Sequence, residues 1–385
     1  MDSDGDTQPQ GRRTGHVVVA PDKFKGSLTA AEVGAAVAAG LHAVQPQLDI
    51  VVLPVADGGD GTLDAALSAG FRRVEVEVAG PMGDPVSAAV GVRERVAVVE
   101  LALASGLVLL PPDALEPLGA NSFGTGQLVL AALNAGCTTI VLGVGGSAST
   151  DGGAGLLRAL GARLLDADGD DLPLGGGALD GLAKVDRSGL DPRLASVEFI
   201  LASDVDNPLL GPRGAAAVYG PQKGADPDDV ELLEAGLTRW ADVLDRAAAD
   251  RPGAGAAGGV GYAVMAVLGA TQRPGIDVVL DLVRFHDQLA GARLVVTGEG
   301  RLDEQTLHGK APAGVAAAAR TAGVPVVAVS GGRDLDDDRL YAAGFAAAYA
   351  CTDIEPDVQR CIDEPIPLLE RLGRSIAEEQ LSTDT

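Results

Sequence analysis

The sequence is poor in aromatic residues, and it has no long hydrophobic run. Aromatic residues make up 3% of the 385 residues while hydrophobic residues make up 46%, so Ala, Val and Leu must supply most of the core. No apolar stretch reaches the roughly 20 residues that a membrane-spanning helix needs. The length suits two domains. The composition is typical of an α/β protein with buried parallel strands and predicts no membrane partner.

Cysteine and histidine are also scarce, and neither forms a metal or redox motif. Cys137, Cys351 and Cys361 make no CxxC pair, and the four histidines lack metal-ligand spacing. We therefore expect reduced thiols in a cytoplasmic protein. A twin arginine near the start precedes only the short apolar run HVVVA, too short for an export signal. Residues 1–15 are expected to be a disordered lead-in.

Positively charged residues are scarce as well. The formal net charge is −25, which argues against nucleic acid as a partner, because nucleic-acid binding needs a basic surface. Adaptation to high salt and GC-rich coding bias both account for this composition, and the sequence does not separate them. In either case lysine is rare in this chain, so each lysine present is less often a surface residue without a specific role. The chain has five lysines: Lys23, Lys25, Lys184, Lys223 and Lys310.

What the sequence does have is a series of short β-branched runs, each ending in a polar or glycine-rich loop, several of them followed by an alanine-rich helical pattern. This order predicts parallel sheets with right-handed crossovers. Residues 71–100 instead alternate with period two and predict an antiparallel meander. We expect a Rossmann-like, doubly wound parallel-sheet domain from residues 16–66 and 286–385, into which residues 67–285 insert a second α/β domain with a mixed sheet. A C-terminal amphipathic helix should pack on the first domain, and the active site should lie in the cleft between the two domains.

The densest glycine loop is LGVGGSASTDGGAG, residues 142–155, between a predicted strand and a predicted helix. Such a loop binds phosphate through backbone N–H groups, or it is a tight turn whose Ser and Asp side chains cap the helix. Its GVGGSA also fits a dinucleotide-binding fingerprint, with Asp166 as the ribose-binding acid. Further glycines interrupt the helix that this fingerprint requires.

Two lysines precede the first predicted helix in APDKFKGSLTAAE. Lys23, Lys25 and Ser27 stand before a capping box formed by Thr29 and Glu32. Positive charge is unfavourable at a helix N-terminus. These lysines therefore indicate a bound anion, the alternative being a solvated pair.

Acidic and mixed-charge loops follow other predicted strands. Asp57 and Asp60 lie in PVADGGDGT, and Asp204 lies in LASDVDNP. Carboxylates on such loops suit magnesium coordination or a general base, and N-capping is the alternative. The segment TGEGRLDEQTLHGKAP adds Arg301 and Lys310 beyond a strand end.

Taken together, these loops resemble the type I glycerate kinase family. The resemblance runs from about residue 16 to about residue 365 and covers nearly the whole chain. The matching stretches, in order, are APDKFKGSLTA, PVADGGDGT, LASGLVLL, NSFGTGQL, GVGGSASTDGGAG, ASDVDNPLLG, GPQKGA, GAGAAGGVGY and TGEGRLDEQTLHGKAPAGVA. The start of ANSFGTG differs from the usual Thr-Ser of that motif.

The resemblance implies an enzyme that phosphorylates D-glycerate with ATP and Mg²⁺, with 2-phosphoglycerate as the common product. Its partners would be small molecules, and it leaves room for a homodimer. For the ATP phosphates we expect a cradle of Gly145, Gly146, Ser147, Ser149 and Thr150, with Lys23 and Ser27 nearby. For catalysis we expect Asp204, Lys25, Arg301 and Lys310. Asp204 and Asp57 are the candidates for binding magnesium, and the sequence does not say which carboxylate is instead the base.

Two other classes stay open at this point. One is a nucleotide-linked oxidoreductase of a small hydroxy acid. The other is a non-catalytic two-domain solute-binding protein.

Overall fold

The computed structural model describes residues 15–307 and 309–382, and the chain forms two compact units. Among the described residues, unit 1 comprises 15–53, 284–307 and 315–382, and unit 2 comprises 54–283 and 309–314. Residues 54–66 and 309–314 thus belong to unit 2, although the sequence assigned them to the first domain. Residues 284–285 belong to unit 1, although the sequence assigned them to the inserted domain. The predicted disordered lead-in lies, apart from Gly15, outside the described residues.

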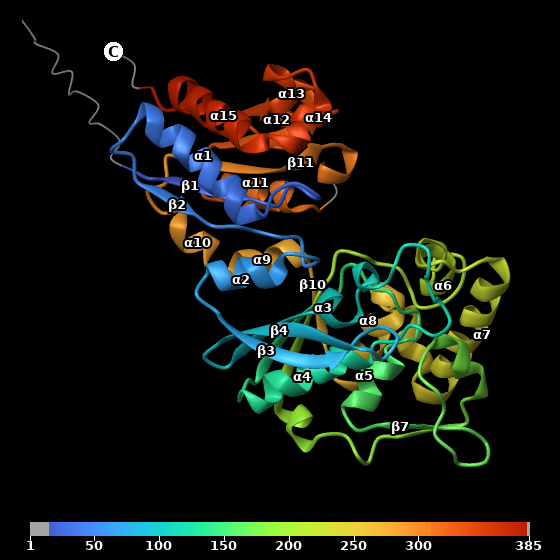
Figure 1. Cartoon of the computed structure of the whole chain (residues 1–385). Helices are drawn as coiled ribbons and strands as arrows, with labels where there is room; N and C mark the ends of the chain where they lie inside the picture. Colours follow the sequence, from blue (N-terminus) through green and yellow to red (C-terminus); the bar gives the residue numbers. More distant parts are fainter. Residues whose placement is uncertain (1–14, 308, 383–385) are drawn as a thin grey trace, which may run out of the picture. The chain divides into compact units, whose positions relative to one another are not determined.

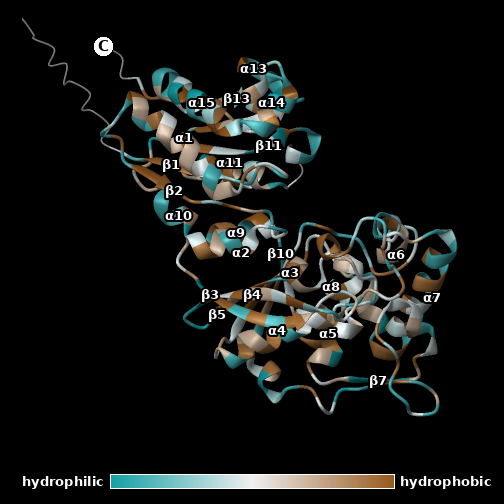
Figure 2. Cartoon of the chain, in the orientation of Figure 1, coloured by the Kyte–Doolittle hydropathy of each residue, from teal (hydrophilic) through white to brown (hydrophobic). Residues whose placement is uncertain are grey.

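The described residues of unit 1 form a five-stranded parallel sheet (Figure 1). Its strand order is β13-β12-β11-β1-β2. Numbered within the unit this is 2-1-3-4-5, a doubly wound order that reverses direction between β1 and β11. β1 is buried at every position because β2 and β11 pair with it on both sides, and Figure 2 shows its hydrophobic character. The strands are β1 (Val17–Pro21), β2 (Ile50–Val52), β11 (Leu294–Leu302), β12 (Val326–Arg333) and β13 (Ala347–Ala350).

Helices cover both faces of this sheet, with α15 on one face and α11 on the other (Figure 1). α1 begins at a capping box of Thr29 and Glu32, as predicted. α15 packs against α1 with its backbone very close, since a Cβ on Gly40 would lie 2.2 Å from the carbonyl oxygen of Glu370. The predicted docking of the C-terminal helix on the first domain is therefore confirmed. The helices are α1 (Ala30–Val44), α10 (Phe285–Gln288), α11 (Ala311–Thr321), α12 (Asp337–Ala342), α13 (Cys351–Ile354), α14 (Val358–Asp363) and α15 (Pro365–Gln380).

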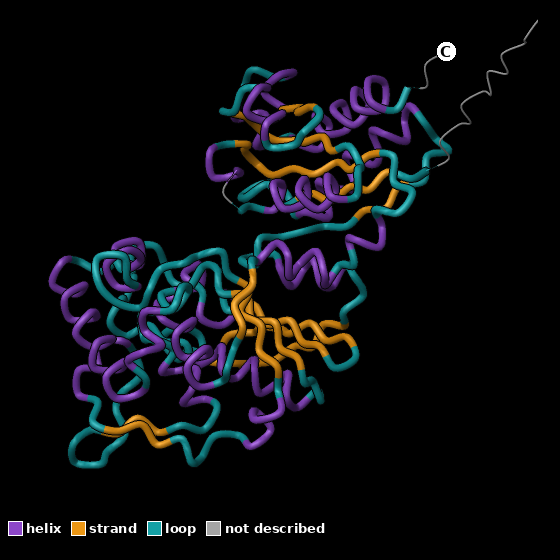
Figure 3. The backbone as a smooth tube through the Cα atoms, turned by 180° about the vertical axis from the view of Figure 1, so that it is seen from behind, coloured by secondary structure: helices purple, strands orange, loops and turns teal. Residues whose placement is uncertain are grey.

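Unit 2 is built on a six-stranded mixed sheet of the order β10-β9-β6-β5-β4-β3, seen from behind in Figure 3. β10, β9, β6 and β5 run parallel, whereas β5, β4 and β3 form the predicted antiparallel meander. A β7-β8 pair lies apart from this sheet. The strands are β3 (Arg72–Ala79), β4 (Pro85–Arg93), β5 (Val96–Glu100), β6 (Thr139–Gly143), β7 (Arg163–Leu165), β8 (Lys184–Asp186), β9 (Glu198–Ala202) and β10 (Thr271–Arg273). The predicted fold class, a doubly wound parallel sheet with a second mixed-sheet α/β unit, is confirmed.

The core of unit 2 is aliphatic, as its composition requires, with Trp240 and Tyr262 as its largest buried side chains. Their rings meet edge to face, with centroids 6.4 Å apart. None of the helices in residues 15–307 and 309–382 combines the length and the hydrophobicity needed to span a bilayer. The helices of unit 2 are α2 (Thr62–Ser68), α3 (Ala102–Ser105), α4 (Phe123–Asn134), α5 (Ala154–Ala159), α6 (Ala215–Tyr219), α7 (Pro227–Leu244), α8 (Ala256–Val267) and α9 (Gly275–Leu282).

Candidate functional site

The candidate site of unit 2 lies at the carboxyl edge of its parallel strands. β5, β6, β9 and β10 run side by side in the same direction, so the loops that follow them emerge at one edge of the sheet. Ligands of open α/β sheets bind outside this edge. The glycine-rich loop after β6 and the Asp204 loop after β9 both lie there.

Close backbone contact joins the glycine-rich loop to the loop that carries Asp57. A Cβ on Gly143 would lie 2.6 Å from the carbonyl oxygen of Gly58, and one on Gly145 would lie 2.7 Å from the Cα of Gly59. Any side chain at these positions would push the two loops apart. The glycines of both motifs are therefore explained by packing as well as by backbone freedom.

The loop contains backbone hydrogen-bond donors that are not used. Within the described residues, the backbone N–H groups of Gly145, Gly146 and Ser147 form no hydrogen bond. Gly146 is exposed and has φ +72°, a conformation that glycine adopts without strain. Successive free N–H groups in such a turn make a concave site for an anion. This stretch fits the phosphate-binding prediction.

The three hydroxyl groups of the loop behave differently from that prediction. Ser149 and Thr150 are fully buried, and their hydroxyl groups have no hydrogen-bond partner in the described part of the chain. The hydroxyl of Ser147 accepts a hydrogen bond from the Lys223 ammonium, at 2.8 Å. In this conformation the unused donors of the loop are the backbone N–H groups at 145–147, of which Gly146 is exposed, whereas the hydroxyl groups of Ser149 and Thr150 are buried.

Asp151 caps the helix that follows the loop. Its carboxylate accepts hydrogen bonds from the backbone N–H groups of Gly153 and Gly155 at the start of α5, at 3.0 and 3.1 Å. It also accepts from the backbone N–H and the hydroxyl of Ser122, both at 2.8 Å. The capping interpretation is therefore right for Asp151. An external anion has no free donors at this helix N-terminus.

Asp204 lies just past β9, where one oxygen of its carboxylate accepts the Gly275 N–H at the start of α9, at 3.0 Å. The Asp204 residue is exposed to solvent, but protein atoms around its carboxyl group remove part of the water from it. This desolvation is the main cause that raises the pKa of Asp204 to about 6, and the nearby carboxylates of Asp57 and Asp277 raise it further. The hydrogen bond from Gly275 acts in the opposite direction. Asp57, predicted together with Asp204, thus lies close enough to act on Asp204 electrostatically. A carboxyl group with this pKa is poised to accept a proton near neutral pH.

Lys310 lies in the short segment that belongs to unit 2. Its carbonyl oxygen accepts the N–H groups of Ala313 and Gly314 in the first turn of α11. A Cβ on Gly314 would lie 2.4 Å from the Ile276 side chain of α9. This segment therefore packs on the helix whose first N–H group binds Asp204.

The sequence interpretation missed two buried charged groups as site residues, Lys223 and Glu100. Lys223 lies beneath the glycine-rich loop and donates to Ser147 and, at 2.5 Å, to the carbonyl oxygen of Ser149. Glu100 ends β5 and accepts the backbone N–H of Leu63 in α2, at 3.0 Å. The scarcity of lysine was the available signal for Lys223, whereas nothing in the sequence around Glu100 distinguishes it from a surface acid.

In unit 1 the predicted basic residues lie at the reversal between β1 and β11, where doubly wound sheets bind ligands. The backbone N–H nitrogen of Lys25 lies near Gly300, since a Cβ on that glycine would be 3.5 Å from it. Arg301 follows directly, and its guanidinium binds both carboxylate oxygens of Asp334, at 2.7 and 2.6 Å. That ion pair raises the pKa of Arg301 and lowers that of Asp334. Unit 1 therefore brings the backbone of Lys25 close to Gly300, the residue before Arg301, and the Arg301 side chain is paired with Asp334.

Lys23 and Ser27 lie in the same loop, before α1. The backbone N–H of Lys23 donates to the Asp22 side chain, at 2.7 Å. The hydroxyl of Ser27 donates to the carbonyl oxygen of Ile362, at 2.7 Å, within unit 1. In this structure the Ser27 hydroxyl thus fastens the loop to α14.

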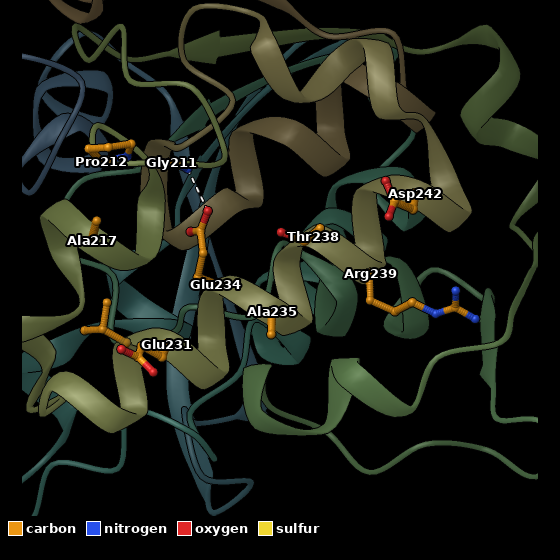
Figure 4. A pocket seen from close by; sticks show the side chains of 10 residues that line it. Gly211, Pro212, Ala217, Glu231, Glu234, Ala235, Thr238, Arg239 and Asp242 are labelled. Carbon is orange, nitrogen blue, oxygen red and sulfur yellow. Dashed lines mark hydrogen bonds between the residues drawn. The ribbon is translucent and has the colours of Figure 1, made fainter.

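A large cavity of unit 2 lies away from these loops. It has a volume of about 630 Å³ and lies between α6 and α7. In Figure 4 the Glu234 carboxylate lies in this region and accepts the Gly211 N–H, at 2.6 Å. None of the predicted site residues lines it. The residues predicted for the site lie at the carboxyl edge of the sheet and not at this cavity.

Comparison with known proteins agrees with this geometry. The sequence profile described as "Glycerate kinase family" matches residues 17–380. A glycerate kinase of Bacillus subtilis is 45% identical over 94% of this chain and 96% of the relative, and a glycerate 2-kinase of Escherichia coli is 43% identical over 87% and 90%. The crystal structure of a candidate glycerate kinase 2 from Salmonella typhimurium LT2 matches with a TM-score of 0.83 and 44% identity, covering 94% of this chain and 97% of that one.

Proposed function

This chain belongs to the glycerate kinase family, and we propose that it transfers the γ-phosphoryl group of ATP to a hydroxyl group of D-glycerate. The 2-hydroxyl is the proposed acceptor, because the similar Escherichia coli protein is named a glycerate 2-kinase. The observation that carries the proposal is the run of backbone N–H groups at Gly145, Gly146 and Ser147 that have no hydrogen-bond partner among the described residues, with Gly146 at its centre exposed. Phosphoryl transfer is catalysed mainly by positioning and charge neutralisation, and such a loop supplies both.

Asp204 is the proposed general base. It takes the proton of the attacking glycerate hydroxyl as the new oxygen–phosphorus bond forms and the bond between the γ-phosphorus and the β–γ bridging oxygen breaks. Its raised pKa, about 6, suits this role. Lys25, Arg301 and Lys310 are proposed to bind the glycerate carboxylate or the transferring group, since charge-assisted hydrogen bonds from Lys and Arg to such oxyanions are strong.

Mg²⁺ is the proposed metal. The described residues contain no cluster of three or more His, Cys, Asp or Glu side chains suited to a metal ion. Magnesium in kinases is held by one or two carboxylates together with the nucleotide phosphates, and the Asp57 and Asp204 pair fits that smaller set. When bound, the ion neutralises charge on the phosphates. If Asp204 binds the metal, Asp57 is the next candidate for the base.

The two alternatives from the sequence lose support. A bound dinucleotide would place its pyrophosphate at the N-terminus of α5, where the Asp151 carboxylate already accepts the free N–H groups. Asp166, the candidate ribose-binding acid, instead accepts the N–H groups of Asp168 and Asp170 in the turn after β7, at 2.9 Å each. A solute-binding protein does not explain a match to an enzyme family along nearly the whole chain.

The decisive experiment measures ADP release by the purified protein with D-glycerate, ATP and Mg²⁺. We expect ADP release that depends on glycerate, and NMR of the product should show phosphate on the 2-hydroxyl. L-glycerate and glycerol are matched controls that change the stereochemistry or remove the carboxylate. No ADP release with D-glycerate, or reduction of NAD(P)⁺ in its place, would contradict the proposal.

We also propose that the protein works in the cytoplasm, where ATP is supplied. The homodimer stays a prediction, and light scattering on the purified protein tests it.

A further inference from the structure

Lys223 is a buried cation beneath the proposed phosphate-binding loop. It lies at the end of the short turn Pro221–Lys223, and its side chain is 2% exposed. Its ammonium donates to the Ser147 hydroxyl and to the Ser149 carbonyl oxygen, at 2.8 and 2.5 Å. Lys223 therefore forms hydrogen bonds with two residues of this loop, Ser147 and Ser149.

No carboxylate in the described part of the chain forms an ion pair with this ammonium. Asp151 is the acid that acts on it electrostatically, and the Asp151 carboxylate is already bound to Ser122, Gly153 and Gly155. The flanking polar groups are also engaged, because Tyr219 binds Asn207 and Asp226 caps α7. Burial, the larger effect, lowers the pKa of Lys223 to about 7, while Asp151 raises it.

An uncompensated buried charge is costly, and such a site becomes favourable when a counter-ion arrives. The unpartnered N–H groups at 145–147 lie on the same loop, one of them on Ser147 itself. The buried Ser149 and Thr150 hydroxyl groups beside them also lack partners. Each of these features favours an anion next to Lys223.

We propose that Lys223 is a positioning residue that takes up a proton when nucleotide phosphates bind the 143–150 loop, so that nucleotide binding is coupled to protonation. This inference rests on the proposed function, because it assumes that the loop binds phosphates. The charged ammonium then fixes Ser147 and Ser149 around the bound anion. By linkage, nucleotide binds more weakly as the pH rises and the free protein loses this proton.

The direct test is an NMR titration of the protein with ¹³Cε-labelled lysine. The chain has five lysines, so the spectrum is simple, and the Lys223→Met variant identifies the Lys223 signal. We expect this signal to titrate near pH 7 in the free protein and at least about one pH unit higher with saturating MgADP. The exposed Lys184 gives an internal control whose signal should not respond to MgADP.

Binding measurements provide the second readout. We expect the Kd for MgADP to rise about tenfold between pH 7 and pH 9 in the wild type. Lys223→Met should bind MgADP about tenfold or more weakly at pH 7 and show little of this pH dependence. Lys223→Arg keeps the charge at every pH and should restore part of the affinity. Lys184→Met is the matched control and should behave as the wild type.

The outcomes separate this inference from the proposed function. MgADP binding and glycerate-dependent ADP release with an unmoved Lys223 signal would overturn the inference and leave the function standing. Failure of the wild-type protein to bind MgADP would overturn both.

Discussion

The cations of the two units lie in opposite environments. Lys223 of unit 2 is buried and has no carboxylate partner among the residues that the structure describes, whereas the Arg301 side chain of unit 1 is 64% exposed and paired with Asp334. A buried group is fixed by everything packed around it, while an exposed ion pair is screened and contributes little to stability. Substitutions at the unit 2 site should therefore have large effects on both activity and loop structure. Substitutions in unit 1 should act on activity alone.

The largest expected effect on activity is that of Asp204→Asn. Asparagine keeps an acceptor for the Gly275 N–H but cannot take a proton, so kcat should fall by about 10²–10⁴-fold. Because the folded state raises the pKa of Asp204 above its ordinary value, ionised Asp204 opposes folding at neutral pH. The variant should therefore be slightly more stable, by about 1 kcal/mol or less after solvent screening. Steady-state kinetics measures the expected fall in kcat, and urea unfolding measures the expected rise in stability. A kcat near that of the wild type would exclude Asp204 as the base.

The pH profile of the wild-type protein also tests whether Asp204 is the general base. A general base must be ionised, so kcat/KM should decline as the pH falls through about 6, the value to which desolvation raises the pKa of Asp204. As the pH rises, loss of the proton from Lys223 should weaken nucleotide binding. Rates measured from pH 5 to 9 test this, and a profile without an acidic limb would contradict the role of Asp204.

Next in size is Gly258→Ala, which tests how tightly unit 2 is packed. Gly258 has φ +65°, and a Cβ there would lie 2.0 Å from the carbonyl oxygen of Ser149. We expect a loss of about 2–4 kcal/mol in unfolding free energy, and a large loss of activity because the loop must shift. Gly70→Ala is the matched control, since Gly70 has φ +88° with open space around it. It should cost about 1 kcal/mol and leave kcat unchanged. Equal losses of stability and activity in the two variants would show that backbone strain alone, and not the close packing around Gly258, causes the effect.

In unit 1, Lys25→Met should lower kcat/KM about 10–100-fold, the cost of one lost charge-assisted contact, without a measurable change in melting temperature. Lys25 is exposed and the structure gives its side chain no buried contact to lose. The Lys184→Met variant controls for the loss of one positive charge. If kcat/KM is unchanged, Lys25 does not contribute to catalysis, and Arg301 is then the remaining candidate in unit 1.

The smallest expected effect on stability is that of the Arg301 and Asp334 pair. A double-mutant cycle with Arg301→Met and Asp334→Asn should give a coupling of less than about 1 kcal/mol in unfolding free energy. If Arg301 also binds substrate, kcat/KM falls in Arg301→Met far more than in Asp334→Asn. Equal losses in the two variants would mean that the ion pair, rather than contact with substrate, is what matters.

Much of the fold was predictable because its signals are local. The capping box of α1, the meander of β3 to β5 and the amphipathic pattern of α15 are all set by residues close together in the chain. The unit boundary was less predictable. Residues 54–66 follow a strand of unit 1 but pack in unit 2, and no local signal distinguishes these alternatives.

The candidate site was predictable in its position and less so in its detail. Polar residues after parallel strands meet at one edge for topological reasons, and this placed Asp204 and the glycine-rich loop within unit 2. Asp57 was assigned to the first domain, because it follows β2 in the chain, but it lies in unit 2. Whether a side chain of the site is exposed or engaged depends on contacts with residues distant in the sequence. Ser149 is buried, and the Ser27 hydroxyl donates a hydrogen bond to the carbonyl oxygen of Ile362.

The sequence by itself determined the fold class, the family and the strand ends at which the candidate site residues lie, because periodicity and motif spacing are properties of neighbouring residues. Tertiary structure alone decided that Asp151 caps α5, that Asp204 has a raised pKa and that Lys223 lies buried beneath the loop. Burial and electrostatic environment arise from residues distant in the chain, and a linear pattern does not contain them.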